Sequence, residues 1–418
     1  MWKMKKSLNR LAIIRKMSKD IKSLYTHIPF CHKICDYCDF TKLQYFRNFA
    51  IDYLKALKDE LDSYHIKELK TIYVGGGTPT ALEDDLFEEL LKIIDTYTDG
   101  VKEYTFEANP ESLSLNKIKM LKSHDVNRIS IGVQTTNDEI LKLVNRDHSF
   151  KQVQEAIKNL KEQGIDNINV DLILGLPHAC KAILKQDIQS ILSLDVKHIS
   201  CYGLTIHPHT VLHTKGYQEP DGDILREYYD IVEDILRENG FIHYEVSNWC
   251  KPGYQSEHNL AYWRNEQYYG CGLGASGYIG ETRYKNTVNL SQYLKRVFVF
   301  EEEDVSEQDK LTYQIMLNLR TIEGLDISFV KNKEKEINEL ISGGLLKLEN
   351  NHLLLADSNT PKTKVKITLS DEVRNFQSEL SKKLKTKVNI KKDISGKGSL
   401  TIPFASDAEL KRIISILQ

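Results

Sequence analysis

Short apolar runs rich in β-branched residues alternate, along the first half of the chain, with segments in which apolar residues recur every three or four positions. The runs predict buried strands at 24–30, 71–74, 104–106, 128–133, 168–174 and 198–206. The segments between them, such as 52–64 and 152–162, have the periodicity of amphipathic helices. Strands that alternate with helices at this spacing predict parallel βαβ units. We therefore expect an α/β fold in which six strands form a partial (β/α)6 barrel of the TIM type.

The pattern changes after residue 300. The acidic run 301–304 predicts a solvated linker. Helical periodicity follows at 310–320 and 333–342, and the apolar segments on either side of Asn350 and Asn351 predict a hairpin. We expect a small α+β domain here.

The end of the chain predicts a further unit of αββα order. Its helices are expected at 369–385 and 407–417, and its strands at 387–391 and 400–404. Pro403 indicates that the second strand lies at an edge or pairs imperfectly, because proline donates no backbone hydrogen bond. So small a unit buries little core alone, and we expect it to dimerise.

Three cysteines, Cys31, Cys35 and Cys38, stand directly behind the first predicted strand. Three thiolates in one short loop can hold three irons of a [4Fe–4S] cube and leave the fourth iron open to a ligand that is not protein. A structural zinc site is the alternative, but it takes four ligands, usually from two separated pairs. The other four cysteines stand singly among apolar or aromatic neighbours, where free cysteines behave as small hydrophobes: Cys180, Cys201, Cys250 and Cys271.

Charge is distributed unevenly although the net charge is only −2. Residues 1–19 hold seven Lys/Arg and no acid, and residues 361–418 hold thirteen Lys/Arg against six Asp/Glu. The N-terminal segment has apolar residues at helical spacing and predicts a peripheral contact with an anionic membrane, unless translation starts at Met17. The tail predicts at most weak, non-specific contact with nucleic acid. An odd number of cysteines and a lysine-, isoleucine- and asparagine-rich composition favour the reducing cytoplasm of a bacterium.

Six sequence motifs in order resemble those of the radical S-adenosylmethionine (SAM) superfamily, in the branch that holds the oxygen-independent coproporphyrinogen III oxidases and the HemW haem chaperones. They are 25–40 (YTHIPFCHKICDYCDF), 75–79 (GGGTP), 106–110 (FEANP), 128–134 (RISIGVQ), 171–177 (DLILGLP) and 258–263 (HNLAYW). The resemblance covers about 24–358. It implies a [4Fe–4S] cluster on Cys31, Cys35 and Cys38 whose open iron is chelated by SAM, which the cluster's electron can cleave.

The resemblance also implies the residues that hold SAM. Tyr25 and Glu107 match contacts to a first SAM, and a further six match contacts to a second one: Tyr37, Gly77, Thr78, Gln134, Arg146 and Asp171. Gly76 and its neighbours remove side chains where the ligand must approach the backbone. These polar residues stand at the ends of predicted parallel strands, where the sites of TIM-like barrels form. The plainer interpretation is that the glycines form a flexible turn and Arg146 is a solvated charge.

Two features favour the HemW branch. Phe40 stands where the oxidases carry a fourth cysteine, and the HNLAYW motif resembles HemW as well. Its imidazole and two large aromatic rings, His258, Tyr262 and Trp263, suit a haem contact. The alternative is a packing corner in which His258 satisfies a backbone carbonyl. Departures from the family include His207 and His209, which are either additional haem or metal contacts or solvated loop residues.

Resemblance also extends to the smaller domains. The helix–helix–hairpin order is similar to the winged-helix-like C-terminal domain of this family, and the tail resembles the dimerisation domain of ParB-type partition proteins. We therefore divide the chain into a basic extension (1–22), the barrel with a family-specific extension (23–300), the winged-helix-like domain (301–358) and the tail (365–418).

The expected function is that of a chaperone which binds haem and delivers it to haem-requiring respiratory proteins. We do not expect the winged-helix-like domain to bind DNA, because no basic stripe marks its second helix. The rival function is an oxidase that decarboxylates the propionate side chains of coproporphyrinogen III. Whether the chain is an enzyme at all depends on which of the two applies.

Overall fold

A computed structural model describes residues 21–356, 371–392, 398–404, 406, 411–412 and 414–416. The chain forms two compact units, Met1–Phe329 and Val330–Gln418. The predicted boundary after residue 300 lies within the first unit, and the four domain ranges given above stay a prediction. The basic segment predicted to touch a membrane lies outside the described residues. Among the residues that the structure describes, no helix combines the length and the apolar character needed to cross a lipid bilayer.

A nine-stranded sheet forms the centre of the first unit, in the order β11-β1-β4-β5-β6-β7-β8-β10-β9. Six neighbouring parallel strands form its centre: β1 (Ser23–Ile28), β4 (Thr71–Gly76), β5 (Glu103–Ala108), β6 (Arg128–Gln134), β7 (Asn167–Leu174) and β8 (His198–Gly203); β11 adds a seventh parallel strand at one edge. The central six are the predicted strands, and the partial (β/α)6 barrel is confirmed. The strands β11 (Tyr269–Cys271), β10 (Asn248–Cys250) and β9 (Ile242–Glu245), which extend the sheet at its two edges, were not predicted.

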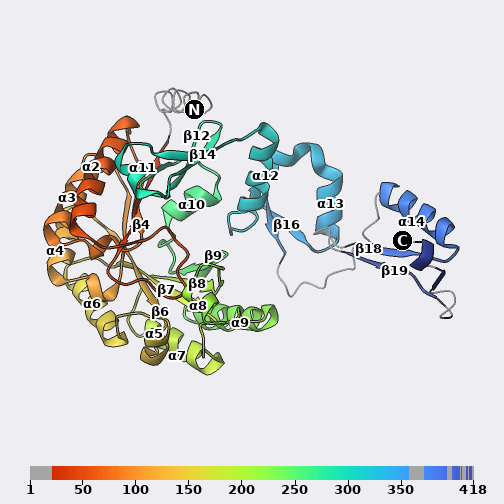
Figure 1. The fold of residues 1–418 in the computed structure, drawn as a ribbon, viewed down its shortest axis with the longest axis horizontal. Helices are drawn as coiled ribbons and strands as arrows, with labels where there is room; N and C mark the ends of the chain where they lie inside the picture. The colour runs from red at the N-terminus through yellow and green to blue at the C-terminus, as the bar shows by residue number, and fades with distance from the viewer. Residues whose placement is uncertain are drawn as a thin grey trace. The chain divides into compact units, whose positions relative to one another are not determined.

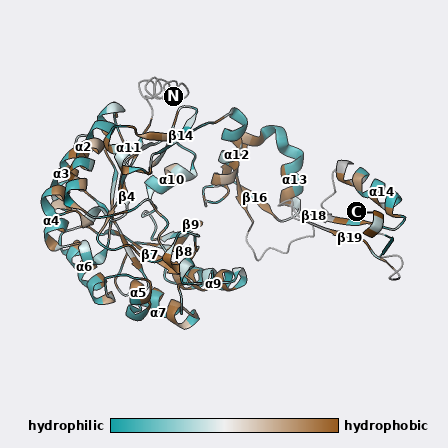
Figure 2. Ribbon diagram, in the orientation of Figure 1, coloured by the Kyte–Doolittle hydropathy of each residue, from teal (hydrophilic) through white to brown (hydrophobic). Residues whose placement is uncertain are grey.

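Helices follow the barrel strands and form an arc around them (Figure 1). They are α2 (Arg47–Ser63), α3 (Asp84–Asp95), α4 (Leu115–Ser123), α5 (Asp138–Leu143), α6 (Phe150–Glu162), α7 (Lys181–Leu192), α8 (Val211–Thr214) and α9 (Gly222–Glu238). Local sequence defines their ends. At α6 the Ser149 side chain accepts from the backbone of Gln152, whose own side chain accepts from the Ser149 backbone, which is a capping box. Figure 2 shows hydrophobic residues along β7 and β8, whereas the surrounding helices carry both kinds of residue.

The two faces of the parallel sheet differ in chemistry. The face toward the helices is apolar and fully buried, with Leu24, Ile72 and Ile129 in the main hydrophobic core. The face toward the barrel interior carries buried polar side chains, among them Arg128 and His198. Alternate residues of a strand point to opposite faces, so one sequence run supplies both surfaces. The interior therefore offers polar groups along its length rather than a packed apolar plug.

A small antiparallel sheet stands beside the barrel within the first unit. It contains β12 (Ser276–Ile279), β13 (Thr282–Asn286) and β14 (Val299–Asp304). The prediction of a linker at 301–304 is therefore wrong, because this acidic run pairs with β13 as the outer strand. An edge strand keeps its acidic side chains in water, so their solvation does not require a linker. The other elements of this unit are β2 (Phe30–Cys31), β3 (Leu43–Gln44), α10 (Glu257–Trp263), α11 (Leu290–Leu294), α12 (Glu307–Asn318) and β15 (Leu325–Asp326).

The second unit contains the predicted helix and hairpin, α13 (Glu334–Ser342), β16 (Leu346–Glu349) and β17 (His352–Leu355). Asn350 and Asn351 have φ of 49° and 66°, the left-handed conformation that a two-residue hairpin turn requires. The tail contributes α14 (Asp371–Leu384) and an antiparallel pair, β18 (Asn389–Lys392) and β19 (Gly398–Thr401). Of the predicted last helix, 411–412 and 414–416 are described, and they are helical.

Candidate functional site

The loop that carries the three cysteines is closed at its base by backbone pairing. Cys31 ends β2, which pairs in parallel with β3. Backbone hydrogen bonds from Leu43 to Pro29 (2.6 Å) and from Tyr45 to Cys31 (2.9 Å) join the two ends of the loop. All three thiols are free and line one cavity of about 410 Å³, which we call the cluster cavity. The predicted convergence of the cysteines on one site is found.

The residues around the thiols leave room for a cluster. Among the described residues, no three His, Cys, Asp or Glu side chains converge where one metal ion would bind. In a cube each thiolate binds a different iron, so its sulfurs stay apart. A Cβ on Gly77 would stand 2.9 Å from Cys31 Sγ, so only glycine leaves this edge of the cavity open. The residues present therefore fit the cluster that the spacing implies.

Burial makes two of the thiols, Cys31 and Cys38, weaker acids than usual by raising the pKa of each. It raises the pKa of Cys31 to about 11, against the smaller opposing effect of the Thr78 hydroxyl 3.6 Å away. Desolvation also raises the pKa of Cys38. Thiolates here need a positive charge, which bound iron supplies.

Strand ends supply the rest of the cluster cavity. Its lining includes eight of the nine residues predicted to hold SAM: Tyr37, Gly76, Gly77, Thr78, Glu107, Gln134, Arg146 and Asp171. The ninth, Tyr25, lines a different cavity. The cavity wall also contains Tyr73, Asn109 and Tyr202, which the sequence reasoning missed. Asn109 stands within the 106–110 motif, and that was the one available signal for it.

Glu107 is the most perturbed carboxyl of the cluster cavity. Desolvation by burial raises its pKa to about 7, and the nearby charge of Asp171 adds to this. Its two oxygens accept hydrogen bonds from the Gly76 N–H (2.8 Å) and the Tyr73 hydroxyl (2.9 Å). A Cβ on Gly75 would stand 2.6 Å from the carboxyl carbon. The Glu107 carboxyl therefore occupies the space that the glycine motif leaves by lacking side chains.

Arg146 joins the cluster loop to the barrel. Its Nη1 donates to Cys35 Sγ at 3.3 Å, and its Nη2 donates to Asn109 Oδ1 at 2.9 Å and to the Gly132 carbonyl. The preceding Asn145 has a φ of 64° and donates to the Ile34 carbonyl within the loop at 2.8 Å. Arg146 is thus a buried cation at the cysteines, and the plainer interpretation of a solvated charge does not apply.

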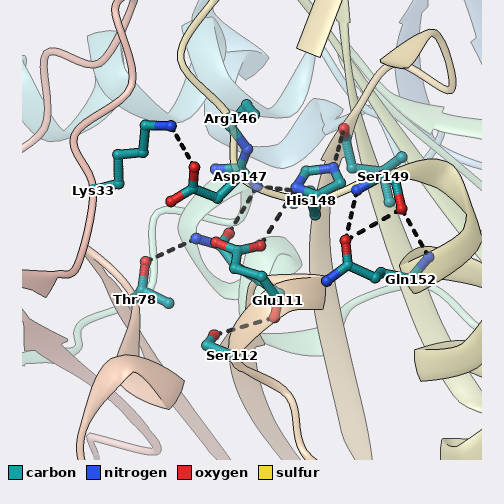
Figure 3. Close-up of polar contacts among 12 residues, drawn as sticks. Lys33, Thr78, Glu111, Ser112, Arg146, Asp147, His148, Ser149 and Gln152 are labelled. Atoms are coloured by element: carbon teal, nitrogen blue, oxygen red, sulfur yellow. Dashed lines mark hydrogen bonds and ion pairs between the residues drawn. The ribbon is translucent and has the colours of Figure 1, made fainter. Parts of the chain in front are cut away.

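A second set of polar contacts holds the segment behind Arg146 in place. Figure 3 shows the Lys33 ammonium on the Asp147 carboxylate and His148 beside Glu111. His148 Nε2 is 3.1 Å from the Val133 carbonyl, and its Nδ1 is 3.4 Å from Glu111 Oε2. These contacts help to hold the segment in place, because they engage the two residues that directly follow Arg146.

Asp171, in the middle of β7, is held by hydrogen bonds from neighbouring side chains. It accepts hydrogen bonds from the Ser130 hydroxyl (3.0 Å) and the Asn169 amide (2.8 Å). Desolvation raises its pKa. Its carboxylate is therefore oriented before any ligand arrives, as a hydroxyl-accepting group must be.

His258 is fully buried and uses both ring nitrogens. Its Nδ1 is 2.8 Å from the Thr71 hydroxyl, and its Nε2 is 2.8 Å from the Tyr262 hydroxyl. Desolvation lowers its pKa to about 3, so the ring is neutral. The Glu103 carboxylate accepts from the backbone N–H groups of Glu257 and His258 and so caps α10. This arrangement has the features of the packing corner, and a haem role for His258, Tyr262 and Trp263 stays a prediction.

A second cavity, of about 420 Å³, lies on the other side of the segment that follows Cys38. We call it the tyrosine cavity; its lining is Tyr25, His27, Asp39, Phe40, Thr41, Tyr262, Tyr268, Gly274, Ala275, Ser276 and Lys285. Asp39 and Phe40 line both cavities. His207 borders the cluster cavity and pairs with Asp39 at 3.0 Å, while the His207 and His209 rings are 6.0 Å apart.

Comparisons with known proteins agree with this geometry. The sequence model of the radical SAM superfamily matches residues 25–188, and that of the ParB dimerisation domain matches residues 369–418. The chain is 39% identical over 353 residues to the heme chaperone HemW of Lactococcus lactis, covering 80% of this chain and 93% of that protein. It is 38% identical over 321 residues to HemW of Bacillus subtilis, covering 73% and 85%.

Among solved structures, the coproporphyrinogen III oxidase HemN of Escherichia coli, a radical SAM enzyme, has a TM-score of 0.72 to this chain. The match covers 83% of this chain and 89% of that one at 21% identity. At that identity the likeness establishes the fold alone.

Proposed function

We propose that this chain, which belongs to the HemW family of heme chaperones, binds haem, carries a SAM-ligated [4Fe–4S] cluster and passes haem to haem-requiring respiratory proteins. The observation that carries the proposal is the cluster cavity. Three free cysteines and eight of the residues predicted to hold SAM line one space at the ends of the parallel strands. A radical SAM site forms at this end of a TIM-like barrel.

The chain's own residues have separate tasks in this cavity. Cys31, Cys35 and Cys38 would hold the cluster, which supplies an open iron and a transferable electron when bound. Arg146 lies against Cys35 and balances the negative charge of the thiolates. Glu107 would accept a hydrogen bond from the ligand's ammonium group, and Asp171 would accept one from a ribose hydroxyl.

Anaerobic haem titration tests the proposal. The full chain, purified without oxygen and assayed for iron and sulfide, is titrated with haem while the Soret band is followed. We expect stoichiometric uptake, and transfer of the bound haem to a haem-free cytochrome subunit added afterwards. Absence of haem binding by protein with a full cluster would refute the chaperone function. A variant with all three cysteines changed to serine separates the contribution of the cluster.

The oxidase alternative gives a different result in a parallel incubation. The same protein is supplied with SAM, dithionite and coproporphyrinogen III. The chaperone proposal requires that no protoporphyrinogen forms, and its formation would overturn the proposal. Phe40 supports the chaperone, because it occupies the place of the oxidases' fourth cysteine.

The tail supports a homodimer as the working form. Its core is small, with only Leu384 and Val388 fully buried among the described residues. Large apolar side chains of the tail stay exposed, among them Phe376 (56%) and Phe404 (49%). Burying such side chains against a second copy would stabilise both units. Sedimentation of the full chain tests this, and a monomer at high concentration would refute it. We place the dimer in the cytoplasm.

A further inference from the structure

We propose that haem lies in the tyrosine cavity, with its macrocycle against Tyr25, Tyr262 and Tyr268 and a propionate paired with Lys285. This inference rests on the proposed haem-binding function and adds the place and the recognising groups. It also gives His258 a new role, that of a positioning residue which holds Tyr262 and does not touch the iron.

The lining of the tyrosine cavity suits a flat aromatic ligand. The Tyr262 and Tyr268 rings meet edge to face, with centroids 4.5 Å apart and planes inclined by 66°. Tyr25 contributes a third ring, and Phe40, which is 67% exposed, stands at the shared rim with the cluster cavity. Aromatic rings gain by stacking or edge contact with another π-system, and large exposed ones gain by being covered. A porphyrin offers both.

His258 lies outside the cavity lining and positions one of the lining tyrosines. It is fully buried and does not line the cavity, whereas its hydrogen-bond partner Tyr262 does. The 2.8 Å contact between His258 Nε2 and the Tyr262 hydroxyl fixes the direction of the tyrosine ring. With Nδ1 on Thr71, the imidazole has no nitrogen left for iron. An axial role would require it to give up at least one of these two buried hydrogen bonds, and a broken buried pair is costly.

Lys285 supplies the charge that a propionate needs. It lies on β13 opposite Ser276, which also lines the cavity, and its side chain is exposed. It forms no ion pair with any residue in the described part of the chain, although Glu301 faces it across the sheet. Asp39, the acid of the same lining, is engaged by His207 at 3.0 Å. An ammonium group at the rim of an aromatic cavity pairs with a carboxylate at the edge of a flat ligand.

The backbone defines the far edge of the cavity. Gly274 has a φ of 74°, and a Cβ there would stand 2.3 Å from the Thr41 hydroxyl oxygen. Glycine thus lets the 274–276 segment approach the segment that follows the cysteines. The close contact between these two backbone segments therefore defines the shape of the cavity at this edge.

Charge reversal tests the propionate contact. Lys285→Glu and the matched surface variant Lys295→Glu are titrated with haem and with haem dimethyl ester, whose propionates are uncharged. We expect Lys285→Glu to weaken haem binding about five- to tenfold and to leave ester binding unchanged. Lys295→Glu should bind both ligands as the natural chain does. Equal effects of the two variants on haem, or an equal effect of Lys285→Glu on haem and ester, would overturn the assignment.

Two further measurements address the rings and His258. Tyr268→Leu should weaken haem and iron-free protoporphyrin IX alike, because the wall contacts the macrocycle and not the metal. His258→Gln, which retains hydrogen-bonding capacity, should keep the Soret maximum in place. A shifted maximum, or failure of protoporphyrin to bind where haem binds, would identify iron ligation as the dominant contact and refute the proposal. If the natural chain binds no haem at all, the proposed function itself fails instead.

Discussion

We predict that Glu107 makes the binding of SAM dependent on pH. The carboxyl is buried, and desolvation raises its pKa to about 7. In the empty cavity it is therefore largely protonated below neutrality. SAM carries a sulfonium and an ammonium group against one carboxylate, so its net charge is positive. A positive ligand binds the ionised carboxyl better than the neutral one. Below the pKa of Glu107, the binding of SAM should therefore release a proton from this carboxyl, and the affinity for SAM should fall as the pH falls.

The size of the effect follows from the pKa. With a value of about 7, about one tenth of Glu107 is ionised at about pH 6 and about nine tenths at about pH 8. If only the ionised form binds, the affinity for SAM rises about tenfold between these two conditions, or about 1.4 kcal/mol. Arg128 lowers the pKa of Glu107 slightly, and Asp171 raises it, so the transition centres near neutrality.

Equilibrium dialysis of SAM against the cluster-loaded chain at a series of pH values measures this. Glu107→Gln should bind more weakly than the natural chain at about pH 8 and should lose the pH dependence. Asp171 lies in the same cavity and also has a raised pKa, so the glutamine variant separates the two carboxyls. An unchanged slope in Glu107→Gln, or a flat profile in the natural chain, would refute the reasoning.

Three other predictions concern the cluster and the fold. Gly77→Ala should lower bound iron and sulfide severalfold, since its Cβ would stand 2.9 Å from Cys31 Sγ, whereas Gly222→Ala, with open space around its Cβ, should retain both on chemical analysis. Arg146→Gln should lower the reduction potential of the cluster by on the order of 100 mV in an EPR-monitored titration, because a buried cation next to Cys35 is lost. Gly270→Ala should lower the free energy of unfolding, measured by urea denaturation, by about 2 kcal/mol or more, because a Cβ there would stand 1.8 Å from the Ser276 carbonyl oxygen. The control Gly100→Ala, whose Cβ would meet no atom within 4 Å, should lower it by about 1 kcal/mol through the positive φ of Gly100 alone.

Local signals predicted the barrel and most of the cluster cavity. Buried parallel strands read as apolar runs, and each of the six lies within a few residues of its expected place. The cysteine loop and the strand-end motifs are short segments whose residues act together, so the sequence alone indicated their convergence. The same holds for the hairpin at Asn350 and Asn351, whose turn conformation is local.

Contacts between segments that are far apart in the sequence could not be predicted from local sequence patterns. The short strand β11 pairs with β1, which lies more than two hundred residues earlier in the chain. A strand of three residues is too short to show a periodic pattern, so the sequence did not predict this pairing. The acidic run of β14 resembled a linker because an edge strand with exposed carboxylates has the same composition. Tyr25 is an example: it lines the tyrosine cavity, which its motif did not indicate, and its predicted contact with SAM stays a prediction. Only the assembled fold separates the two cavities.

The segment after Cys38 gives these cavities a physical connection. Asp39 and Phe40 line both, so whatever orders the loop for the cysteines also orders one wall of the tyrosine cavity. A ligand that selects one arrangement of a shared wall changes the affinity of the neighbouring site, and the change is equal in both directions. Phe40 has no thiol to hold iron, and it is largely exposed where the two cavities meet. Phe40, which stands where the oxidases carry a fourth cysteine, thus lies at the boundary between the cluster cavity and the tyrosine cavity.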